Sequence, residues 1–182
     1  TVPHYGNLLG LVAFGLEELG LYDQAESYCR DETDKNPDDL WAVHAVAHVM
    51  EMQQRAVDGI KWLDYSLDHF RDFNPFRGHI WWHKGLFLID SGSPEAALSL
   101  YDHAIHDTQS EFFLDVQNSV SFLARLELCG VDVGDRWQEL AAGSFDGKVW
   151  STWPYQIDIP RLRCRMDQPL ILRGTCARKC FG

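Results

Sequence analysis

The segment LGLYDQA, residues 19–25, returns in outline at three later points of the chain: QQRAVDG (53–59), SGSPEAA (91–97) and CGVDVGD (129–135). Each copy follows an apolar run. The second positions of the four copies lie 34, 38 and 38 residues apart, and they are Gly20, Gln54, Gly92 and Gly130. A turn that often needs Gly, between two apolar runs, is typical of antiparallel helix pairs. The recurrence therefore predicts a chain of helix pairs.

Residues that end or begin helices, found between the copies, support the same interpretation. In DKNPDDLWAV, Pro37 cannot continue the preceding helix, and Asp38 or Asp39 can cap the next one. Small residues follow three of the turns by five positions, where two helices would approach closely: Ala25, Gly59 and Ala97. No stretch indicates a strand. Helices are expected at about 4–19, 23–34, 39–52, 56–71, 77–90, 94–106, 111–129 and 134–143.

The predicted fold is all-α, an antiparallel helix-pair solenoid of about four pairs. The spacing and the pattern LGLYDQA…DKNP resemble tetratricopeptide repeats. Three longer segments resemble the tetratricopeptide repeat protein 38-like family: WAVHAVAHVMEMQQR (41–55), HIWWHKGLFLIDSG (79–92) and LELCGVDVGDRWQELA (126–141). The resemblance covers roughly residues 5–145. It implies a helical-repeat fold and no particular reaction.

The composition changes near residue 150. Residues 1–150 hold 10 Lys and Arg against 25 Asp and Glu, whereas residues 151–182 hold 6 against 2. We therefore expect a repeat domain over 1–150, part of a longer array, and an atypical basic tail over 151–182. Two explanations of the tail stay open. It could be foreign to the fold, through a divergent or shifted reading frame, or it could fold back on the acidic repeats.

Charge and apolar patterning exclude two classes of partner. The net charge of −11 argues against nucleic acid. No apolar run approaches the roughly 20 residues that span a bilayer. The five cysteines are odd in number and match neither a zinc ribbon nor a disulfide framework. Reduced thiols and a cytoplasmic location are therefore expected.

Two of the predicted helices carry a narrow polar stripe in apolar surroundings. The residues of each stripe share one helix face; they are His44, His48 and Glu51 in one helix and His79, His83 and Asp90 in the other. Glu17 occupies the matching position of the first pair. First helices of successive pairs line the concave side of such a solenoid, about 8–10 Å apart. The imidazoles are therefore expected to converge there.

Three interpretations of the stripes stay open. They could be polar residues tolerated on a partly wet face, with His hydrogen-bonded to a carboxylate on the next helix. They could form a binding groove with an aromatic rim, in which Trp82 rather than Trp81 flanks His83, since adjacent residues point about 100° apart. They could hold zinc or non-haem iron, since His at i and i+4 can chelate from one face. Ala45 stands where a His-Glu-x-x-His motif has its general base.

We predict a binding or scaffolding module that holds a peptide, protein or small molecule in the groove and needs no cofactor. The expected ligand-binding residues are His44, His48, Glu51, His79, Trp82 and His83. The alternative is an enzyme that uses the His and Glu cluster, with or without a metal ion. A concentration of titratable groups in one place favours an active site over a general scaffold. The sequence assigns neither a catalytic residue nor a metal ligand.

Overall fold

The structure is a computed structural model that describes residues 5–67, 76–106 and 113–144. Helices joined by turns make up these ranges, which hold no strand, and this confirms the predicted all-α class. The eight α-helices lie close to the predicted ranges, and a short π-helical turn, η1, follows the sixth. The bounds are α1 Tyr5–Glu18, α2 Tyr22–Lys35, α3 Leu40–Met52, α4 Ala56–Leu67, α5 Arg77–Asp90, α6 Pro94–Leu100, η1 Tyr101–Ile105, α7 Phe113–Leu128 and α8 Arg136–Ser144.

The four recurring turns share one backbone geometry. Their second residues all have positive φ, with values of 74° at Gly20, 57° at Gln54, 80° at Gly92 and 84° at Gly130. In the first turn, the Gly20 N–H donates to the Glu17 carbonyl at 2.8 Å, and the Leu21 N–H donates to the Leu16 carbonyl at 2.9 Å. The other three turns repeat this pair of bonds. The sequence repeat thus corresponds to four left-handed helix ends of the Schellman type.

A side-chain cap fixes the start of α3, as was predicted from the segment DKNPDDL. The Asp39 carboxylate accepts from the N–H groups of Trp41 and Ala42 at 3.1 and 3.2 Å. These N–H groups have no partner inside the helix, so the carboxylate satisfies donors that would otherwise be buried unpaired. Asp39 itself is buried. The cap therefore sets where α3 begins, and with it the positions of the histidines one turn later.

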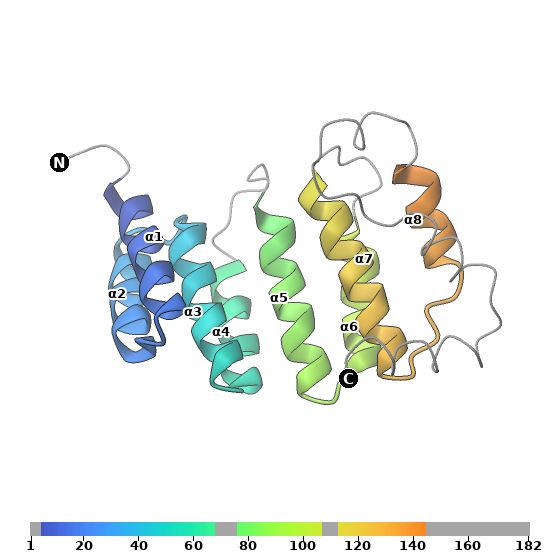
Figure 1. The fold of residues 1–182 in the computed structure, drawn as a ribbon, viewed down its shortest axis with the longest axis horizontal. Helices are drawn as coiled ribbons and strands as arrows, with labels where there is room; N and C mark the ends of the chain where they lie inside the picture. The colour runs from blue at the N-terminus through green and yellow to red at the C-terminus, as the bar shows by residue number, and fades with distance from the viewer. Residues whose placement is uncertain (1–4, 68–75, 107–112, 145–182) are drawn as a thin grey trace. The chain divides into compact units, whose positions relative to one another are not determined.

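The chain divides into two compact units, Thr1–Ser93 and Pro94–Gly182. In the first unit, α1 packs against α2 and α3, and α3 also packs against α4 and α5 (Figure 1). Helix α3 is the centre of the unit's core, with most of its small apolar residues fully buried. A Cβ at Gly10 would lie 2.8 Å from the Ala42 nitrogen, so this glycine lets α1 approach α3 closely. Gly59 does the same for α4 and Phe87 of α5, as expected from its place after the turn.

The second unit has its own core. The rings of Tyr101 and Phe122 lie parallel at 6.3 Å, and Leu123, Leu126 and Trp137 are buried with them. Arg136 of α8 donates two hydrogen bonds of 2.6 Å to Asp102 of η1. This ion pair joins α8 to η1.

Some predictions fall where the structure gives no description. The tail over 151–182, the boundary near residue 150 and the predicted helical residues 68–71 and 111–112 lie outside the described residues. Within the described ranges, no helix is both long enough and apolar enough to cross a bilayer.

Gln54 is the one non-glycine residue among the four left-handed turn positions. A side chain in this region costs about 1–2 kcal/mol, partly offset by the greater freedom of unfolded Gly. Gln54→Gly is therefore expected to raise the free energy of unfolding by about 0.5–1 kcal/mol in urea titrations. The matched control is Gln53→Gly, where φ is −90° and the substitution should destabilise. Equal effects of the two changes on the free energy of unfolding would contradict the left-handed conformation of Gln54.

Candidate metal centre

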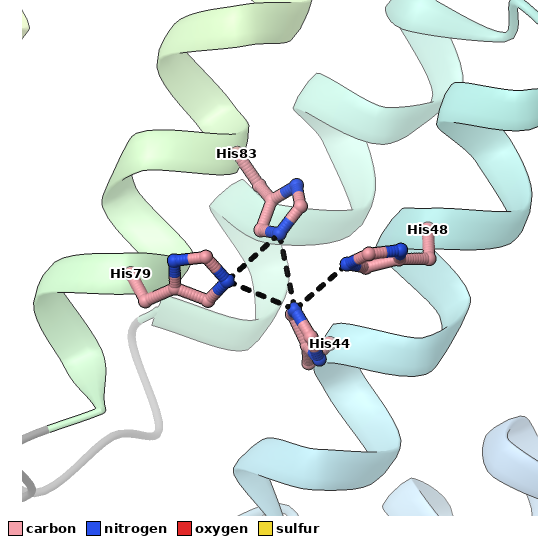
Figure 2. Close-up of side chains that lie close together, drawn as sticks. All are labelled: His44, His48, His79 and His83. Carbon is pink, nitrogen blue, oxygen red and sulfur yellow. Dashed lines mark hydrogen bonds between the residues drawn. The ribbon is translucent and has the colours of Figure 1, made fainter. Parts of the chain in front are cut away.

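Four histidines from two neighbouring helices meet at one point. His44 and His48 lie one turn apart on α3, and His79 and His83 lie one turn apart on α5. Since α3 packs against α5, the two pairs face each other (Figure 2). One ring nitrogen from each histidine lies within 4.8 Å of those of the other three.

The Nε2 atoms form a compact group. Those of His44, His79 and His83 make a triangle with edges of 3.0 Å (His44–His83), 3.1 Å (His44–His79) and 3.3 Å (His79–His83). The His48 Nε2 lies 2.9 Å from that of His44. Figure 2 shows all four rings turned so that these atoms point inward. The arrangement therefore presents four nitrogen donors to a common centre.

Aromatic rings enclose the group. Phe14 of α1 stacks on the His44 ring at 5.5 Å, and Phe76 meets the same ring edge-on at 5.1 Å. Trp82 stacks on His79, with ring centroids 5.3 Å apart and planes inclined by 11°. His44 and His83 are consequently only 4% and 1% exposed. Three helices and their aromatic side chains cover these two rings, which therefore lie deeper than a residue on a wet helix face.

Carboxylates lie behind the histidines. His83 donates through Nδ1 to Glu51 Oε2 at 3.0 Å. This bond places the proton on Nδ1 and leaves the Nε2 lone pair facing the centre. On the other side, Glu17 Oε2 lies 3.8 Å from His48 Nδ1, and Glu17 is only 5% exposed.

Glu17 was not among the predicted site residues, although the sequence carries a signal for it. Glu17 and Glu51 each stand three residues before a left-handed turn, at Gly20 and Gln54. Equivalent positions in successive helix pairs place both carboxylates beside the histidines. By contrast, Asp90, which extends the stripe of α5 in sequence, is exposed at the end of that helix. Trp81 packs on the core, whereas its neighbour Trp82 contacts the histidines.

Burial controls the protonation of the group. It lowers the pKa of His44, His48 and His83, and the neighbouring histidines lower the pKa of His44 and His83 further. These rings are therefore neutral near pH 7, the form that binds a metal ion without first losing a proton. Burial also raises the pKa of the Glu17 carboxyl, and the nearby carboxylates of Glu18 and Glu51 act in the same direction.

Comparison with known proteins adds no assignment. No protein-family model matches the chain, and no solved structure matches it. The resemblance to the tetratricopeptide repeat protein 38-like family therefore stays a prediction. The chemistry of the site rests on its own geometry.

The lowered histidine pKa values predict how stability depends on pH. Below the ordinary pKa of 6.5, the unfolded chain takes up protons that the folded chain resists, so stability falls as the pH drops. Each fully buried histidine contributes a loss of up to about 1.4 kcal/mol per pH unit below that value. Glu17, whose pKa is raised, works in the opposite direction as a single group. Urea unfolding with a chelator present, between about pH 7.5 and 5.5, measures the slope.

His83→Gln should reduce this slope by about one histidine's contribution. The matched control is His103→Gln, a change at an exposed histidine outside the cluster. Stability that stays constant or rises as the pH falls through this range would contradict the neutral, buried state of the cluster.

Proposed function

We propose that this chain is a helical-repeat protein whose four histidines bind one divalent transition-metal ion between α3 and α5. The observation that carries the proposal is the triangle of three Nε2 atoms at 3.0–3.3 Å. A neutral imidazole nitrogen is either a donor or an acceptor. Among three such atoms, two must have the same role. At least one edge of the triangle therefore brings two N–H donors or two lone pairs face to face. Hydrogen bonding alone leaves the group unsatisfied.

A metal ion removes this conflict, because it accepts a lone pair from every nitrogen at once. Zinc binds imidazole nitrogen at about 2.0–2.1 Å in tetrahedral geometry, which separates the nitrogens by about 3.3–3.4 Å. The four separations within hydrogen-bond distance, 2.9–3.3 Å, reach the lower end of that range, and all four atoms lie within 4.8 Å of one another. Small outward rotations of the rings would therefore admit the ion.

The charge of the surroundings suits a dication. Four neutral imidazoles add no charge, and the carboxylates of Glu17 and Glu51, when ionised, offset a charge of two. Outer carboxylates that accept from ligating histidines orient the rings and strengthen their donor atoms. Glu51 already makes such a bond to His83. A set of four nitrogen ligands favours zinc, whereas non-haem iron sites usually include a carboxylate ligand.

The proposed architecture is the antiparallel helix-pair solenoid of tetratricopeptide type. Its support is the recurrence of one turn geometry at the end of α1, α3, α5 and α7. The site would then join the first helices of the second and third pairs. The resemblance to the tetratricopeptide repeat protein 38-like family belongs to the same proposal.

A second candidate function is retention of a peptide or small molecule beside the ion. Trp41 is 36% exposed and meets the His44 ring edge-on at 5.9 Å, and Trp82 stacks on His79. Aromatic side chains next to polar groups are typical of ligand sites. An ion at such a rim would also suit a metal-dependent enzyme. A cytoplasmic location remains part of the proposal, and Cys29 and Cys129 are free thiols.

Metal content provides the test. Protein purified without a histidine tag is expected to bind one equivalent of zinc by elemental analysis. Zinc at a free concentration of 100 times its Kd should stabilise the fold by about 2.7 kcal/mol, and a chelator should reverse the gain. His79→Ala should lower both the zinc content and the stabilisation.

His103→Ala is the matched control, because it removes an exposed histidine that lies outside the cluster. It should retain the full zinc content. No stoichiometric metal in the wild-type protein, or equal losses in the two variants, would contradict the proposed function.

A further inference from the structure

The four imidazoles are not equivalent. In Figure 2, three dashed lines close the triangle of His44, His79 and His83, and one line reaches His48 from His44. Three nitrogens at 3.0–3.3 Å from one another already form one face of a tetrahedral coordination sphere. His48 supplies the fourth corner.

The outer contacts of the histidines also differ, although the division is not the same, because Nδ1 of the buried His44 has no hydrogen-bond partner and its ring is held by Phe14 and Phe76. The His83 ring is fixed from behind by the 3.0 Å bond to Glu51, and His79 is held by stacking on Trp82. The corresponding separation for His48, from Nδ1 to Glu17, is 3.8 Å, beyond hydrogen-bond distance. An outer hydrogen bond normally fixes the orientation of a ligating ring. His48 lacks that restraint from Glu17.

Exposure separates His48 from the deeper ligands. Its side chain is 27% exposed, whereas that of His83 is 2% exposed and His44 is buried. Solvent therefore reaches the site at His48, and His79 is partly exposed as well. Near Nδ1 of His48, on the outer side of its ring, the buried Oε2 of Glu17 has no hydrogen-bond partner. Such an oxygen can accept from a ligand that carries a proton.

We propose that His48 is an exchangeable ligand, so that the ion is held by His44, His79 and His83 and its fourth position opens to a small neutral ligand. This inference rests on the proposed function. Water is the simplest such ligand, and three histidines with an open position form the arrangement in which zinc activates water. The carboxylates of Glu17 and Glu51 disfavour anions at this position. A neutral oxygen or nitrogen donor fits it best.

The test uses the full chain loaded with Co²⁺, whose visible absorption reports coordination number in zinc-type sites. His48→Ala should weaken Co²⁺ binding by about tenfold or less, comparable to the loss of an outer partner. His79→Ala is the matched comparison, since His79 is also half-buried and lies on the facing helix. It should weaken binding by about 100-fold or more, because it removes one of the three retaining ligands.

Free imidazole gives the second readout. Added to the Co²⁺-loaded His48→Ala protein, it should enter the vacated position and restore the wild-type spectrum. In the wild-type protein, high imidazole should shift the spectrum as His48 is displaced, a measurement that does not depend on any variant folding.

The following outcomes would contradict the proposal. Equal losses of Co²⁺ in His48→Ala and His79→Ala, or spectra that imidazole leaves unchanged, would overturn the exchangeable role of His48 while leaving metal binding intact. A wild-type protein that takes up no Co²⁺ would overturn the proposed function, and this inference with it.

Discussion

The crowding of four imidazole nitrogens between α3 and α5 is the constraint on which the first unit depends. Separations of 2.9–3.3 Å are too short for lone pairs to face one another without a proton or a cation between them. Burial makes protonation costly, as the lowered pKa values show. The helices nevertheless approach closely, because apolar packing around α3 holds them together. The apolar core thus stabilises a polar cluster that would be unfavourable alone.

The turns show how far local sequence determines this fold. Gly20, Gly92 and Gly130 appear at regular steps, and each adopts the left-handed conformation that a helix end requires. Gln54 adopts it as well, although its residue type gives no such signal, so the periodicity was the better guide. The sequence left Asp38 and Asp39 open as the cap of α3, and the structure assigns it to Asp39. Local rules therefore predicted the helices and their ends.

The site was predicted less completely. Spacing identified the two His pairs, and the assumption of adjacent first helices brought them together. Burial could not be read from spacing, since it depends on Phe14 and Phe76, which come from other parts of the chain. Such contacts are set by tertiary packing, which a pattern along one helix does not contain.

The positions of Glu17 and Glu51 have a consequence for the energetics of the polypeptide without an ion. Both lie in the last turn of a helix, where the aligned peptide dipoles give the helix end a partial negative charge. An acidic side chain is disfavoured there and a basic one is favoured, so these two glutamates oppose the helix macrodipoles. Without an ion, lysine or arginine at these positions would interact more favourably with the helix dipoles. The histidine cluster is therefore flanked by two helix ends at which a carboxylate and the helix dipole repel each other. A bound cation would reduce both repulsions.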